Sequence, residues 1–112
     1  MNELIQNNSK QTNKDIKIGK IIETIKKYDL YKEISYTIRV SCASNESDET
    51  TFKRIKHALS IMSDSEISSA YYNFKQYMEM YLIQLQKLNY DNKLSDTGKN
   101  HLGILESDIN FI

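Results

Sequence analysis

The sequence predicts an all-α fold, a four- or five-helix bundle with a flexible N-terminal arm. Proline is absent and glycine occurs only three times in 112 residues, which leaves few of the turn residues that hairpins and barrels need. Apolar residues recur instead at helical spacing in several segments. Because 112 residues is the size of one ordinary domain, we expect a flexible arm at residues 1–13 and a single helical domain at residues 14–112.

The first predicted helix covers residues 14–28 and follows the arm, which is polar and has little apolar periodicity. One face of this helix is apolar and lysines lie on the other. The apolar face consists of Ile18, Ile21, Ile22, Ile25 and Tyr28.

Residues 30–43 fit two kinds of secondary structure. A half-buried strand is indicated by alternation with polar residues, at Ile34, Tyr36, Ile38, Val40 and Cys42. A helix is indicated by spacings of four, at Leu30, Ile34, Ile38 and Cys42. No second segment of similar quality offers a partner for a lone strand, whose backbone groups would stay unpaired. A helix over residues 30–43 is therefore favoured, with the strand as its alternative.

The remaining helices are predicted at residues 48–62, 65–88 and 95–107, separated by polar breaks. Ser63 and Glu66 have the spacing of a capping box at the start of the longest helix. That helix carries the strongest pattern in the chain, a heptad seam with alternating spacings of four and three. The seam consists of Ile67, Tyr71, Phe74, Met78, Tyr81, Leu85 and Leu88.

A second apolar stripe lies off this seam. It consists of Tyr72, Met80, Ile83 and Tyr90. A helix that is apolar on two sides either lies at the centre of its bundle or exposes one face to a partner. Since tyrosine is enriched at interfaces, the predicted protein interface is Tyr72, Tyr77, Met80 and Tyr90.

The sequence shows no signature of an enzyme, a metal site or a cofactor site. Cys42 is the only cysteine, and His57 and His101 are far apart in the chain, so the donors that a metal site needs are scarce. Nothing around Cys42 favours a thiolate, and no glycine-rich phosphate loop is present. A single cysteine fits a reducing cytoplasm, and the apolar runs are too short to cross a membrane. We expect a cytoplasmic, non-catalytic protein.

The charge distribution is balanced and gives one basic cluster. Fifteen basic residues match fifteen acidic ones, whereas a freestanding nucleic-acid binder is usually clearly basic. Lys53, Arg54 and Lys56 gather on one predicted helix. They are either ordinary solvated surface or contacts to the phosphates of RNA or DNA.

The segment around this cluster resembles a known family. Phe52–Ser60 (FKRIKHALS), continued by Ser65–Phe74 with its paired tyrosines, is similar to the small helical subunit of type I-A CRISPR effector complexes, as is Ile18–Ile22 upstream. The resemblance implies a non-catalytic subunit in antiviral defence that supports guide RNA and target DNA. Lys53, Arg54 and Lys56 are the positions that it implies for this contact.

Two other functions remain as alternatives. Leu94–Leu102 (LSDTGKNHL) resembles the segment that follows the wing in winged-helix regulators, which implies a DNA-binding role. Small helical inhibitors and immunity proteins of phages and bacteriocin operons have a similar size and charge, and bind a protein target. The leading hypothesis is a non-catalytic binding or assembly subunit, with a protein partner or with copies of itself.

Overall fold

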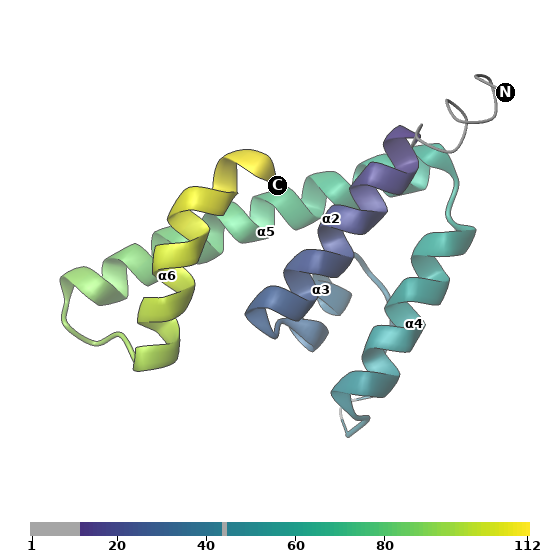
Figure 1. Ribbon diagram of the computed structural model, residues 1–112. Helices are drawn as coiled ribbons and strands as arrows, with labels where there is room; N and C mark the ends of the chain where they lie inside the picture. The colour runs from purple at the N-terminus through teal and green to yellow at the C-terminus, as the bar shows by residue number, and fades with distance from the viewer. Residues whose placement is uncertain (1–11, 44) are drawn as a thin grey trace, which may run out of the picture.

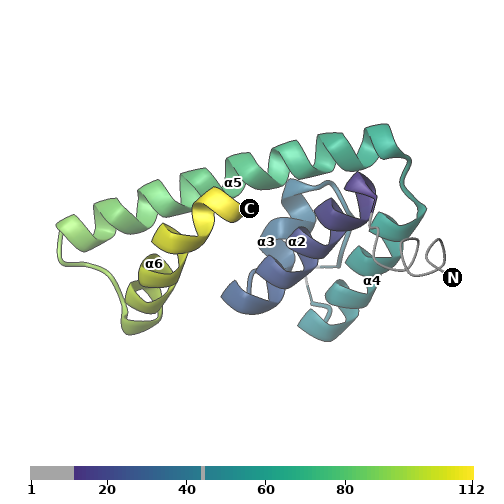
Figure 2. The ribbon, with the colours of Figure 1, turned by 45° about the horizontal axis from the view of Figure 1, so that its top comes forward.

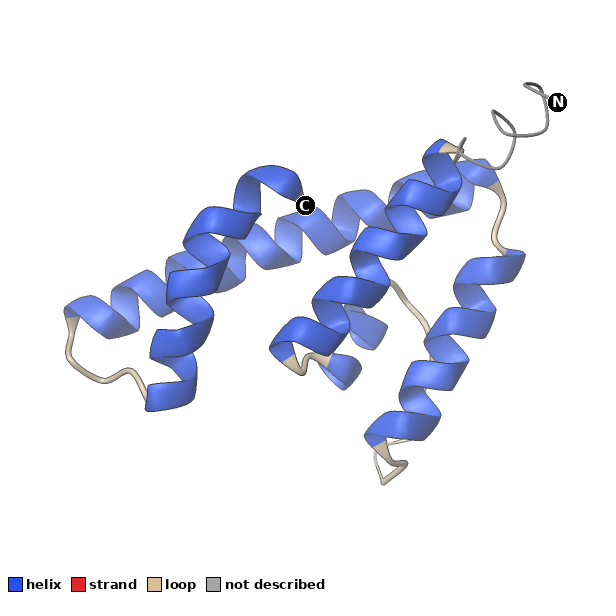
Figure 3. Ribbon diagram, in the orientation of Figure 1, coloured by secondary structure: helices blue, strands red, loops and turns tan. Residues whose placement is uncertain are grey.

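The computed structural model describes residues 12–43 and 45–112, and these residues form helices without any strand (Figures 1 and 3). The elements are α2 (Asn13–Tyr28), α3 (Tyr31–Thr37), α4 (Asp48–Ile61), α5 (Asp64–Tyr90), α6 (Asp96–Asp108) and the 3-10 helix η1 (Ile109–Phe111). The predicted all-α bundle is confirmed. Residues 1–11 of the predicted arm lie outside the described residues.

The helix boundaries follow from side-chain caps that the sequence encodes. The Ser63 hydroxyl accepts a hydrogen bond from the backbone N–H of Glu66 at 3.1 Å, and the Glu66 carboxylate accepts one from the N–H of Ser63 at 2.8 Å. This is the predicted capping box, and it starts α5. Thr12 caps α2 in a simpler way, so the helix begins at Asn13 and the predicted arm is one residue too long.

The long helix α5 carries the rest of the molecule on one side (Figure 2). Helices α2 and α3 pack against its N-terminal half, α4 packs on α3 and α2, and α6 folds back against its C-terminal half. The molecule is elongated, with extents of 57 × 33 × 22 Å. The side of α5 that faces away from the other helices is uncovered by the described residues.

The heptad seam of α5 is its buried face. Ile67, Phe74 and Met78 are fully buried, Leu85 is 4% exposed, and Tyr71, Tyr81 and Leu88 are half-buried. The other helices contribute to the same core through Ile21, Ile25, Tyr28, Ile34, Ile55, Leu59, Leu102 and Leu105. The seam therefore packs inward.

The predicted helix over residues 30–43 is wrong in its second half. Helix α3 ends at Thr37, and Arg39 adopts the left-handed conformation with φ of 63°. This reversal lets the N–H of Val40 donate to the carbonyl of Ser35 at 2.9 Å, while the Ser35 hydroxyl donates to the carbonyl of Val40 at 2.6 Å. The chain leaves the helix because these two buried bonds satisfy its end, and residues 40–43 run on outside any helix.

Candidate functional site

The side of α5 that faces away from the other helices (Figure 2) carries large side chains that are exposed to solvent. Tyr72 and Met80 are each 63% exposed, Ile83 is 56% exposed and Tyr90 is 88% exposed. With Gln76, also exposed, these residues are termed the outer face of α5. At about 100° per residue they lie on the opposite side of the helix from the buried seam, so no rotation of α5 could bury both sets in this bundle.

The structure divides the predicted interface residues. Tyr72, Met80 and Tyr90 lie on the outer face, but Tyr77 does not. Tyr77 is half-buried, and its ring stacks on Tyr81 with 6.2 Å between centroids and 8° between planes. Burial raises the pKa of Tyr77 to about 12. Tyr77 therefore lies on another side of α5 than Tyr72, Met80 and Tyr90. The predicted interface does not include Ile83, which belongs to the second apolar stripe.

Charged residues border the outer face on both edges. By helical geometry, Lys75 and Glu79 lie toward one edge, and Lys87 and Asp91 lie toward the other. Glu79, Lys87 and Asp91 are exposed. The ion pairs between described residues involve none of these four, and Lys75 Nζ lies over the Tyr71 ring, 5.9 Å from its centroid. The charges of Glu79, Lys87 and Asp91 are therefore available to another molecule.

A hollow of about 530 Å³ opens beside the N-terminal end of the outer face. Its lining is formed by Ile38, Arg39, Met62, Ser65, Glu66, Ser69, Ala70 and Asn73. It is termed the Arg39 hollow. Arg39 is exposed, and its guanidinium makes no ion pair with any described residue. Glu66 supplies a carboxylate, whose pKa is lowered chiefly by the hydrogen bond from the backbone of Ser63. The hollow thus combines small side chains with one charge of each sign.

The predicted basic cluster lies on α4 but is largely compensated. Arg54 donates to the Glu46 carboxylate at 3.0 Å, and this hydrogen bond lowers the pKa of Glu46. Lys53 forms an ion pair with Glu49 at 3.5 Å. The third cation, Lys56, lies over the ring of Phe52, with 4.8 Å from its Nζ to the ring centroid. The structure brings the three cations together, but it places two carboxylates among them.

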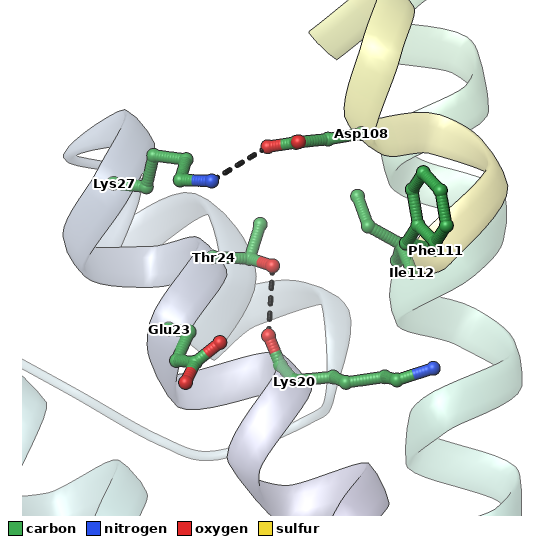
Figure 4. A pocket seen from close by; sticks show the side chains of 7 residues that line it. All are labelled: Lys20, Glu23, Thr24, Lys27, Asp108, Phe111 and Ile112. Atoms are coloured by element: carbon green, nitrogen blue, oxygen red, sulfur yellow. Dashed lines mark hydrogen bonds and ion pairs between the residues drawn. The ribbon is translucent and has the colours of Figure 1, made fainter. Parts of the chain in front are cut away.

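A small cleft lies between α2 and the end of the chain (Figure 4). Its volume is about 120 Å³, and it is lined by Lys20, Glu23, Thr24, Lys27, Asp108, Phe111 and Ile112. The Asp108 carboxylate accepts bonds from Lys27 Nζ at 2.7 Å and from the Tyr28 hydroxyl at 3.1 Å. The Lys27 bond lowers the pKa of Asp108, and burial raises that of Tyr28. This junction fastens α2 to α6 and leaves little room for a ligand.

The histidines and the cysteine do not assemble a reactive site. His101 Nδ1 lies 2.7 Å from the Tyr81 hydroxyl, and its ring meets the edge of Tyr28 at 5.2 Å. His57 is exposed on α4, and Cys42 lies half-buried among residues 40–43. In the part of the chain that the structure describes, no group of three His, Cys, Asp or Glu side chains is placed to hold a metal ion. Nor does this part contain a helix long and apolar enough to span a bilayer.

The segment that resembles a winged-helix regulator forms the start of α6. Ser95 caps this helix by accepting from the N–H of Gly98 at 3.0 Å. The wing itself would be a β-hairpin just before it. Residues 89–93 instead form the end of α5 and a turn, with Asn92 in the left-handed conformation, so this hairpin is absent.

Comparison of the chain with protein-family models, with curated proteins and with solved structures found no match.

Proposed function

We propose that this chain is a non-catalytic protein-binding subunit, and that the outer face of α5 is its interface. The observation that carries the proposal is the row formed by Tyr72, Met80, Ile83 and Tyr90, each more than half exposed. These side chains share one face of one rigid helix. Large apolar side chains exposed along one face of a helix often mark a surface that a partner covers.

The composition of the outer face suits a protein partner. Tyrosine and methionine are enriched at protein interfaces, and aromatic anchors often carry most of the binding energy. Gln76 supplies a hydrogen-bonding group at the centre of the face, and the charged residues stand at its edges. Large apolar side chains together with a polar rim are typical of a specific interface.

Contact with nucleic acid receives less support. A phosphate-binding cluster needs cations whose charge is free to replace counterions, whereas Arg54 and Lys53 are paired with Glu46 and Glu49. The outer face of α5 offers Lys75 and Lys87 but also Glu79 and Asp91. An assembly or inhibitory role through protein contacts is therefore preferred to the RNA- and DNA-supporting role that the CRISPR resemblance implies.

Photo-crosslinking from the outer face tests the proposal. A photoreactive phenylalanine analogue at Gln76, in the cells that make the protein, should give a discrete crosslinked product. The product should disappear when Ile83→Arg is added, because a buried charge disrupts an apolar interface. The matched control carries the same group at His57, exposed on α4. Absence of a product from position 76, or the same products from both positions, would contradict the proposal.

A charge-reversal variant tests the nucleic-acid alternative. We expect the parent protein to show no strongly salt-dependent affinity for single-stranded RNA or DNA, and Lys53→Glu/Arg54→Glu/Lys56→Glu to keep the product from position 76. The corresponding triple glutamine variant is the control, because added glutamates also repel Glu46 and Glu49. If the parent binds nucleic acid in low salt and both variants lose that binding, the basic cluster is the functional site.

A further inference from the structure

We infer that the partner of the outer face is a second copy of this chain, in an antiparallel dimer with its two-fold axis at the middle of α5. The inference rests on the proposed function, in which this face is a protein interface. Helix α5 has 27 residues, with Tyr77 at its middle. Since all other described helices lie on one side of α5 (Figure 2), two copies can approach back to back without a clash between these helices.

The register follows from the spacing of the exposed residues. An axis just past Tyr77 pairs residues that are equally far from it on the two helices. Tyr72 then meets the partner's Ile83, and Ile83 meets the partner's Tyr72. A two-fold interface requires such self-complementarity, because every contact occurs twice. Each apolar side chain of this pair is thus covered by a large apolar side chain.

The same register places Tyr90 opposite the partner's Ser65. Tyr90 is the most exposed residue of the outer face, at 88%, and lies at the C-terminal end of α5. Its counterpart across the axis is the partner's Ser65, which lines the hollow of about 530 Å³. Tyr90 therefore lies at the margin of the partner's hollow, at the same distance from the axis as Ser65.

The charges along both edges are complementary in this arrangement. In an antiparallel pair, each edge of the helix faces the same edge of the other copy. Lys87 therefore comes near the partner's Glu66, and Asp91 comes near the partner's Arg39. On the other edge, Lys75 comes near the partner's Glu79. Pairing of opposite charges favours this register over shifted ones.

The available area indicates a weak, reversible dimer. At 1.5 Å per residue α5 is about 40 Å long, and a helix presents a strip about 10 Å wide. Two such strips bury roughly 800 Å² in total. Specific interfaces usually bury about 1,200 Å² or more. We therefore expect the dimer to have a dissociation constant in the micromolar range.

Sedimentation equilibrium over a concentration series tests self-association. The parent should shift from monomer to dimer as its concentration rises. Ile83→Arg should weaken association by about 100-fold or more, because each dimer holds this residue twice. Phe111→Arg is the matched control, since Phe111 is 75% exposed but lies by the cleft between α2 and the chain end. A parent that stays monomeric at every concentration, or equal weakening by both variants, would overturn the dimer.

Crosslinking between single-cysteine variants tests the register. In a Cys42→Ser background, Ser69→Cys and Lys87→Cys are each treated with a short bis-maleimide, alone and mixed. Both positions lie on one edge of the outer face, nearly equidistant from the axis. Only the mixture should give a crosslinked dimer. A crosslinked dimer in either variant alone would indicate a parallel pair. If sedimentation shows a dimer but the mixture gives no crosslink, this register is excluded.

The two proposals fail separately. If the parent is monomeric but the probe at Gln76 captures a different protein, the dimer is wrong and the outer face remains an interface. If the probe at Gln76 gives no product and the parent is monomeric, both proposals are wrong.

Discussion

The two halves of α5 are supported very differently by the rest of the bundle. The N-terminal half packs against α2 and α3, and its seam residues Ile67 and Phe74 are fully buried. The C-terminal half packs against α6, and there Leu85 is 4% exposed and Leu88 is half-buried. One continuous heptad pattern therefore serves two environments. How deeply a heptad position is buried therefore depends on how many helices pack against it, and not on the heptad pattern alone.

Removing the centre of the better-covered half should have the largest effect. Phe74 is fully buried, so Phe74→Ala leaves a cavity and should lower the free energy of unfolding by about 3–5 kcal/mol. That loss approaches the whole stability of a small domain. Urea denaturation followed by far-UV circular dichroism measures it. A variant that unfolds at the same urea concentration as the parent would show that this half is not the stability centre.

A matching truncation in the other half should cost less and act locally. Leu105 is fully buried between α6 and α5, and Leu105→Ala should cost about 2–3 kcal/mol. Because α6 contacts few other elements, its amides should exchange faster while those of α2 remain protected. Hydrogen exchange read residue by residue tests this. Equal loss of protection in both halves would mean that the molecule opens as one unit.

The hydrogen bonds from Lys27 and Tyr28 to Asp108 should contribute least to the free energy of unfolding, and their contribution should depend on pH. Lys27 and Tyr28 lower the pKa of Asp108 below its ordinary 3.8. A lowered carboxyl pKa adds stability that is present above pH 3.8 and is lost as the pH falls through the folded-state value. Asp108→Asn should therefore cost about 1 kcal/mol at neutral pH. The difference from the parent should shrink below about pH 4, and denaturation at several pH values measures it. A constant difference would exclude the carboxylate as its source.

Much of the fold could be predicted because helix signals are local. The capping box at Ser63 and the seam of α5 are properties of neighbouring residues, and both are present in the structure. The segment at residues 30–43 could not be assigned so simply. The four-residue spacings fit helix α3 as far as Thr37. The alternating pattern continues into residues 40–43, which form neither helix nor strand. The helix ends at Thr37 because buried Ser35 bonds to Val40, a contact that no periodicity encodes.

The candidate site could be predicted only in part. Tyr72 and Tyr90 were expected at an interface and lie on the outer face, where the off-seam pattern placed them. Tyr77 was expected there too, but its ring stacks on Tyr81 and packs against the core, because the buried arc of α5 is wider than the heptad seam. The Arg39 hollow depends on a left-handed residue and three converging segments, which the sequence gives no means to assemble.

Because α5 is one continuous helix, it fixes how its C-terminal half is rotated about the helix axis relative to its N-terminal half. One residue inserted between Phe74 and Leu85 would turn the C-terminal half by about 100° and advance it by about 1.5 Å. Seven inserted residues would restore the rotation to within about 20°, but the half would then stand about 10 Å away and Asp108 would lose Tyr28. No insertion preserves both angle and distance, so this stretch of α5 acts as a spacer whose length is fixed.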